Sequence, residues 1–270
     1  LYFQDDWSVT PRLTLNLGLR WSYESPFSTK YGQQSQFDPS AIDPLTGRTG
    51  AIIHTTGLLS RRDWNNFQPR VGAAYKINDK MVFRGGFGLT TIDLFTVGLD
   101  QNFEEYFTSV TLQSPPGDPR PAFFLRQGPG QVRYNVLPDG TSPFVGANYG
   151  ARGATWYDPG MRSPYSMNWN GTFQYQFAPT WLFELSYQGS SGVGLLNAWD
   201  MNAIPLDVSR DPAVLNEIYR NQQNYRPYPQ FGAINLWSNF GHSTFHSGTA
   251  KFEKRFSRGL MLTSFYTWAK

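Results

Sequence analysis

The histidines are the first residues of this sequence whose type and spacing could do chemistry. His242 and His246 stand four residues apart, a spacing that on a helix lets two imidazoles bind one metal ion. Both lie in a segment whose pattern predicts a strand, where four residues span roughly 13 Å. We therefore expect no shared metal ion and no cofactor.

Catalytic constellations do not stand out either. The sequence shows no Ser/His/Asp arrangement, no glycine-rich nucleotide loop and no carboxylate pair in a catalytic context. Cysteine is absent, which excludes disulfides and thiolate metal sites. The net charge is only +3 and the basic residues are scattered, so nucleic-acid binding has no electrostatic basis. We expect a protein that is neither an enzyme nor a nucleic-acid binder.

Aromatic residues in the predicted loops are the candidates for ligand contact, because flat rings stack on sugars and apolar groups. The same rings could instead pack the loops onto each other or lie at a membrane interface. The candidates are Tyr149, Trp156, Tyr157, Trp199, Tyr225, Tyr228 and Trp237.

The elements that carry these residues are predicted to be strands. The chain of 270 residues is 17% aromatic and 16% charged, with 26 Gly and 19 Pro. Such a composition is rich in strand and turn formers and poor in helix formers. No apolar run is long enough for a transmembrane helix. The prediction is an all-β fold.

Strict alternation of apolar and polar residues gives the strands. Residues 165–177 place aromatic residues on one face and only polar residues on the other, and a second alternation over 181–189 follows a short turn. The same hairpin pattern recurs along the chain. About eight strands in four hairpins are predicted: 1–7 with 13–23, 67–77 with 81–89, 165–177 with 181–189, and 244–256 with 260–268.

The connections point to a membrane barrel. Short turns alternate with three long segments, 24–66, 93–163 and 192–243, which all fall at the same end of the strands. Strands of roughly 10 residues, short turns at one end and long loops at the other are typical of outer-membrane barrels. The pattern predicts an antiparallel transmembrane β-barrel wall. One short helix is predicted within the third loop, over 211–220, with Asp211 as N-cap and Pro212 at the first helical position.

Several segments resemble one family. The chain resembles the barrel part of TonB-dependent transporters of the Oar-like type, which carry a carboxypeptidase-regulatory-like domain ahead of the plug. The resemblance covers nearly the whole chain in the order of the family. The segments are YFQDDW (2–7), TPRLTLNLGLR (10–20), NFQPRVG (66–72), RGGFG (84–88), PY (164–165) with WN (169–170), ELSYQGS (184–190), RPYPQFG (226–232), KFEKRFSRGL (251–260) and YTWAK (266–270).

The resemblance implies a location and partners. A family barrel closes with about 22 strands, so residues 1–270 are expected to be a partial barrel without plug or regulatory domain. Implied partners are outer-membrane lipid and, through the full-length parent, a plug domain and the energy-coupling complex that drives passage of a large, unidentified solute across the bacterial outer membrane. Two other functions stay open: a passive porin or surface adhesin barrel, and a soluble glycan-binding β-protein.

The polar face of the strands is expected to line the lumen. Its residues could hold the plug or a passing ligand, or they could simply form a solvated face. They are Asn168, Asn170, Gln174, Gln176, Glu184, Lys251, Glu253 and Arg255.

Overall fold

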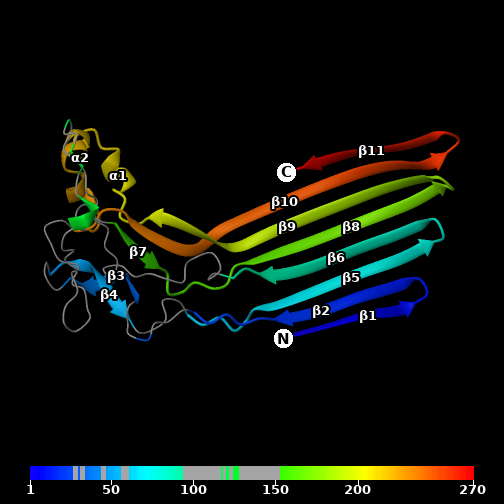
Figure 1. Cartoon of the computed structure of the whole chain (residues 1–270), viewed down its shortest axis with the longest axis horizontal. Helices are drawn as coiled ribbons and strands as arrows, with labels where there is room; N and C mark the ends of the chain where they lie inside the picture. The colour runs from blue at the N-terminus through cyan, green and yellow to red at the C-terminus, as the bar shows by residue number, and fades with distance from the viewer. Residues whose placement is uncertain are drawn as a thin grey trace.

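The computed structural model of the chain describes residues 1–26, 30, 34–43, 47–55, 61–93, 117, 120, 121, 124–127 and 153–270. Its main element is one long antiparallel sheet in the order β1-β2-β5-β6-β8-β9-β10-β11 (Figure 1). The bounds of these strands are β1 Tyr2–Thr10, β2 Leu13–Trp21, β5 Phe67–Asn78, β6 Met81–Thr91, β8 Tyr165–Ala178, β9 Trp181–Asp200, β10 Ile234–Ser257 and β11 Leu260–Ala269. The predicted eight strands in four hairpins are confirmed.

The ladder register places the aromatic and polar residues on opposite faces. Phe173 pairs with Phe83 on β6 and with Leu185 on β9, while the adjacent Gln174 pairs with Val82 and Glu184. Side chains alternate between the two faces of a sheet along each strand. One face of the sheet, the aromatic face, therefore carries the residues that a lipid environment accepts, and the other, the polar face, carries the amides and charges.

Tight turns close all four hairpins at the same end of the sheet (Figure 1). In the β5–β6 turn, the Asn78 side chain accepts the amide of Lys80 at 2.9 Å, and Lys76 forms an ion pair with Asp79 at 2.6 Å. The β10–β11 turn uses the left-handed backbone of Arg258 (φ 51°) and Gly259 (φ 75°). The three long connections meet at the opposite end, which we call the loop end.

The sheet is open. β1 and β11 lie at its two edges, and in the described part of the chain neither edge has a further partner strand. The eight strands therefore form a curved section of wall and not a closed barrel. An edge strand exposes unpaired N–H and C=O groups, which lipid cannot satisfy. Further strands must cover both edges in a membrane.

The third predicted loop is shorter than 192–243, because β9 and β10 are 20 and 24 residues long. A tilted strand needs only about 9–11 residues to cross a bilayer, so both continue well beyond it (Figure 1). The register shifts near Gly241, and Gly194 opposite has φ 63°. This bulge interrupts the alternation, which is why the sequence pattern ended both strands too early.

Three strands lie inside segments that were predicted as loops. They are β3 Gln34–Ile42, β4 Thr49–Thr55 and β7 Ala154–Tyr157. β3 and β4 form a separate antiparallel hairpin, and β7 pairs in parallel with the extension of β10. β3 contains Pro39 and lacks alternation, so its sequence carried no strand signal.

The predicted helix exists but begins later. The third connection contains α1 Leu206–Ser209, α2 Leu215–Asn221 and the 3-10 turn η3 Gln222–Tyr225, and a second 3-10 turn, η1 Leu125–Gln127, lies in the second connection. Asp211 is not an N-cap: its carboxylate accepts the amide of Ala213 at 2.9 Å and closes a turn before α2.

Substitutions on the two faces test this assignment. Leu185 is 52% exposed on the aromatic face, five residues from the hairpin end, and Leu185→Arg should block assembly, since a lipid-facing Arg near the midplane costs about 2–4 kcal/mol. Gln174→Arg on the polar face should be tolerated, because the new cation lies beside Glu184. Folding of the full-length parent into lipid vesicles, followed by heat-modifiable gel mobility, measures both. Equal tolerance would contradict the assignment of the faces.

Candidate functional site

The described parts of the long connections gather at the loop end, where they form one cluster (Figure 1). It combines the β3–β4 hairpin of the first connection, β7 of the second, and the third connection with α1 and α2. β7 joins the cluster to the main sheet, because Ala154 pairs with Ile234 and Tyr157 pairs with Trp237 on β10. The loop cluster is thus a structured platform built on the extended ends of β9 and β10.

A small hydrophobic core holds the three connections together. Phe37 from β3, Ala154 from β7, Phe231 from the third connection and Ile234 at the start of β10 are all buried and in contact. The Phe37 ring meets Phe231 and Tyr228 edge-on, with centroids 5.0 Å apart in each case, a geometry that aromatic quadrupoles favour. Each connection therefore contributes to a core that none could form alone.

Two buried amides complete the cluster. Asn202 is fully buried, and its Nδ2 donates to the carbonyls of Tyr228, Phe231 and Gly232 at 2.7–3.0 Å, while its Oδ1 accepts the amide of Tyr228. Gln230 Nε2 donates to backbone carbonyls of β4, at Thr49 and Gly50. Arg226 pairs with Asp200 at 3.2 Å. These contacts give physical roles to the RPYPQFG segment, which the sequence singled out without assigning a function.

Several aromatic residues that were predicted to lie in loops lie on strands in the structure. Trp156 and Tyr157 lie on β7, Trp199 on β9 and Trp237 on β10. Tyr157 is buried, and Trp156, Tyr228 and Trp237 pack against the two small cores of the cluster. Tyr225 ends η3, and Tyr149 lies outside the described residues. Packing of the connections explains most of these rings, and their contact with a ligand stays a prediction.

Trp199 is the exception among them. It is 59% exposed and lies against Phe240, which is 46% exposed, with ring centroids 5.7 Å apart. Phe240 was not a candidate from the sequence, since only the pairing of β9 with β10 brings it to Trp199. This exposed pair is the part of the cluster best suited to stack on an apolar or sugar-like group.

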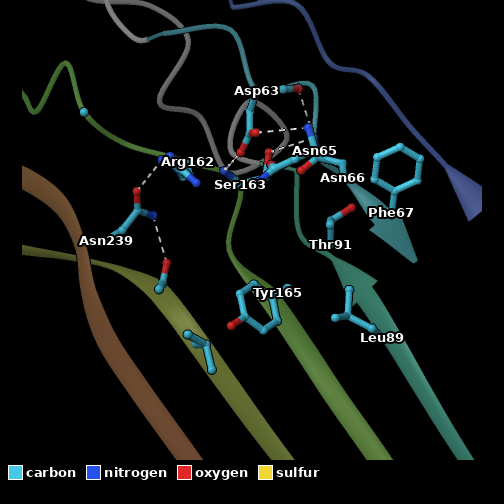
Figure 2. A pocket seen from close by; sticks show the side chains of 13 residues that line it. Asp63, Asn65, Asn66, Phe67, Leu89, Thr91, Arg162, Ser163, Tyr165 and Asn239 are labelled. Carbon is cyan, nitrogen blue, oxygen red and sulfur yellow. Dashed lines mark hydrogen bonds between the residues drawn. The ribbon is translucent and has the colours of Figure 1, made fainter. Parts of the chain in front are cut away.

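A cavity of about 380 Å³ lies below the cluster, where β5, β6, β8 and β9 reach the loop end (Figure 2). Asp63 Oδ2 accepts the amide of Ser163 at 3.0 Å, and the buried Asn66 donates to Ser163 Oγ at 3.2 Å. Asn239 accepts the amide of Arg162 at 2.7 Å and donates to the carbonyl of Gly194 at 2.8 Å. Polar contacts in the walls of the cavity therefore join the first and second connections to strands β9 and β10.

Beside the cavity, the Gln68 side chain links the ends of neighbouring strands by hydrogen bonds. Gln68 Nε2 donates to the hydroxyls of Ser22 at 2.8 Å and Thr91 at 2.9 Å, linking the ends of β2 and β6 across β5. Beyond them, burial and a hydrogen bond with the Asp93 carboxyl raise the pKa of Glu24 to about 7. This carboxyl pair shares a proton near neutral pH.

The eight predicted lumen residues all lie on the polar face, and four of them form a network. Gln174 Nε2 donates to Glu184 Oε2 at 2.7 Å, Glu184 pairs across the ladder with Lys251, and Lys251 forms an ion pair with Glu253 at 2.8 Å. The network crosses β8, β9 and β10. This part of the polar face therefore carries charges of both signs, and the Lys251 ammonium offsets the charges of the Glu184 and Glu253 carboxylates.

Metal chemistry finds no support in the part of the chain that the structure describes. No group of three or more His, Asp or Glu residues there could hold a metal ion. Among the same residues, no helix is long and apolar enough to cross a membrane.

Comparison with known families agrees with this architecture. A family model described as an outer membrane beta barrel domain matches residues 1–270. The chain belongs to this family. The outer membrane β-barrel domain thus resides in the bacterial outer membrane, which rules out the soluble glycan-binding alternative. A search of curated proteins gave no match.

Solved structures similar to this barrel domain include two receptors and a transporter of much greater length. The siderophore receptor PirA from Pseudomonas aeruginosa is 11% identical with a TM-score of 0.42, and the match covers 100% of this chain and 33% of the receptor. A mutant of the ferric enterobactin receptor PfeA from the same organism (11%, 0.46) is covered to 26%, with 99% of this chain aligned. The FrpB iron transporter from Neisseria meningitidis (13%, 0.43) is covered to 25%, with 100% of this chain aligned. The barrel domain spans only 25–33% of the length of these three proteins.

Asn202 provides a test of the loop cluster. Asn202→Asp replaces the amide that donates to three carbonyls by a carboxylate that cannot donate, and should weaken the cluster by about 1–3 kcal/mol. Trypsin should then cleave the third connection faster, at Arg210 or Arg220, while the barrel keeps its heat-modifiable mobility. Asn197→Asp is the matched control, because Asn197 is exposed on β9 and only its Oδ1 is used, accepting the amide of Ala198. Equal cleavage rates for the two variants would contradict the role of Asn202.

Glu24 predicts a local pH dependence. Its folded pKa is about 7 against an ordinary value of 4.5, so between these pH values the folded state binds more protons than the unfolded state. Local stability should therefore fall as the pH rises from about 4.5 to about 7, and change no further above that. The pH dependence of this local stability can be measured by amide hydrogen exchange of residues 22–26 and 91–93 in the full-length parent. Glu24→Gln should flatten the profile, and an unchanged slope would exclude Glu24 as its source.

Proposed function

We propose that this barrel domain is the wall and loop section of a TonB-dependent transporter of the Oar-like type, which moves a large solute across the outer membrane. The observation that carries the proposal is the loop cluster: three connections fold into one platform with an exposed ring pair, above a sheet with a charged polar face. A passive pore needs no such platform. The role is one of binding and passage, without catalysis.

The two faces and two ends have separate tasks in this proposal. The polar face lines the lumen and surrounds the plug domain of the full-length parent, which the energy-coupling complex moves. The aromatic face contacts outer-membrane lipid. The loop end is extracellular, because hairpin turns as short as Asn78 to Met81 are typical of the periplasmic side. A solute would meet Trp199 and Phe240, on the extended ends of β9 and β10, before it reaches the membrane-spanning part of the wall.

Electrical conductance tests transport against the passive-porin alternative. The full-length parent in a planar bilayer should show no steady conductance, since a plug fills the lumen of large transporter barrels. Deletion of the plug domain should open an ohmic pore, and the intact protein should bind the periplasmic domain of the energy-coupling protein. Steady ohmic conductance of the intact parent would instead identify a porin, and a closed parent without coupling-protein binding would favour an adhesin.

Epitope tags test the orientation independently. A tag inserted after Arg210, in the exposed segment between α1 and α2, should be detected on intact cells that express the full-length parent. A tag between Asn78 and Asp79 should be detected only after the outer membrane is permeabilised. Insertions in exposed connections are tolerated, because closure entropy grows slowly with loop length. Detection of only the second tag on intact cells would reverse the orientation.

A further inference from the structure

A row of polar rings crosses the aromatic face near the loop end. Trp169 on β8 pairs with Gly189 on β9, and Gly189 pairs with His246 on β10. His246 and Lys270 exchange both backbone hydrogen bonds, at 3.0 and 2.9 Å, so they stand directly opposite each other with side chains on the same face. The row therefore presents an indole, an imidazole and an ammonium group side by side.

Tyr187 links the rings of this row. Trp169 Nε1 donates to the Tyr187 hydroxyl at 3.4 Å, and the hydroxyl contacts His246 Nδ1 at 2.8 Å. An indole N–H can only donate, so the phenolic oxygen accepts it and has its own proton available for Nδ1. When the phenolic proton is directed at Nδ1, Nδ1 accepts and the imidazole proton lies on Nε2. His246 then offers an outward N–H donor.

Gly189 is required for this arrangement. A Cβ at this position would overlap the Trp169 indole, so the absence of a side chain lets the indole lie flat against β9. His246 is exposed, and Tyr187 is 43% exposed. In the part of the chain that the structure describes, the Lys270 ammonium has no ion pair. The row is thus rigid at its centre and offers two unused donors.

The position of the row matches the level of lipid headgroups. Trp169 lies ten residues from Pro179 in the hairpin turn, which is about the number that a tilted strand needs to cross the hydrocarbon layer. Toward the hairpin end the same face continues with Leu185, Phe173 and Ala250, and toward the loop end with Ser191 and Thr244. Beyond this row the face is mixed, because Ser191, Thr244 and His242 lie among Met167, Tyr165 and Val193.

We infer that Trp169, Tyr187, His246 and Lys270 form a binding site for a phosphorylated glycolipid headgroup of the outer leaflet. The Nε2–H of His246 and the ammonium of Lys270 donate to the phosphate, and the indole face supports a sugar ring. Charge complementarity selects the phosphate, and the placement on the lipid-contacting face selects a lipid as its source. The site lies on the opposite face of the sheet from the proposed solute path and needs only the proposed orientation.

The probe is lipopolysaccharide, used with its lipid A either intact or enzymatically dephosphorylated. Each form is added to the full-length parent in detergent, and native mass spectrometry counts the bound lipid molecules. His246→Phe keeps an aromatic ring on the lipid face and removes both nitrogens, and it should weaken binding of the intact lipid about tenfold. Lys270→Gln should act in the same direction. Neither change should alter binding of the dephosphorylated lipid. Gly189→Ala displaces Trp169 without removing a donor and should weaken both lipids.

His242→Phe is the matched control, because His242 lies exposed on the same strand four residues away, and its side chain forms no hydrogen bond, ion pair or ring contact with the described residues. Heat-modifiable mobility confirms that each variant is folded. Equal effects of His246→Phe and His242→Phe, or equal affinity of the parent for the two lipids, would overturn the site. A change in subunit number without a change in lipid binding would assign the row to a contact between copies of the protein. Reversed epitope tags would overturn both the orientation and the outer-leaflet site, whereas loss of lipid selectivity with the tags as expected would overturn the site alone.

Discussion

The constraint on which this structure depends is the backbone hydrogen-bond ladder. Lipid offers no partner for an N–H or C=O group, so every strand that crosses the membrane must be paired along its length. The six inner strands meet this demand by antiparallel pairing on both sides, and β1 and β11 meet it on one side. The pleat of the ladder then determines on which face each side chain lies, because successive residues of a strand point alternately to lipid and to the lumen.

The loop cluster is stabilised by side-chain packing and buried amides and not by a continuous backbone ladder. Outside the membrane, water can satisfy the backbone, so a core must stabilise any defined structure. Phe37, Phe231 and Ile234 supply that core from connections far apart in the sequence. Asn202 and Gln230 then satisfy the carbonyls that the turns around them leave unpaired. Specificity here comes from a few buried amides, since the apolar area is small.

The sequence predicted the membrane part well and the cluster poorly, for a physical reason. The strands between hairpin turn and membrane interface obey one local rule, alternation, which can be read without knowing what each strand pairs with. β3 and β7 obey no such rule, because their side chains are chosen by contacts with other connections. Phe37 could not be identified as a core residue until Phe231 and Tyr228 lay beside it.

The same limit applies to the candidate site. The predicted polar residues lie together because alternation alone places them, and the pairing of Glu184 with Lys251 follows from the hairpin order. The aromatic candidates were selected by residue type in presumed loops, and most of them instead pack inside the cluster. A bulge at Gly194 concealed the strands that carry Trp199 and Trp237, since an inserted residue shifts the alternation that a sequence pattern depends on.

The extension of β9 and β10 beyond the membrane has a mechanical consequence. A paired ladder resists stretching and shear along its whole length, so the loop cluster is attached to the barrel by a stiff arm and not by a tether. The bulge near Gly194 and Gly241, where the register shifts, is the point of greatest compliance in that arm. At this point the Asn239 side chain donates to the Gly194 carbonyl at 2.8 Å, so a bend of the arm would have to break or stretch this hydrogen bond.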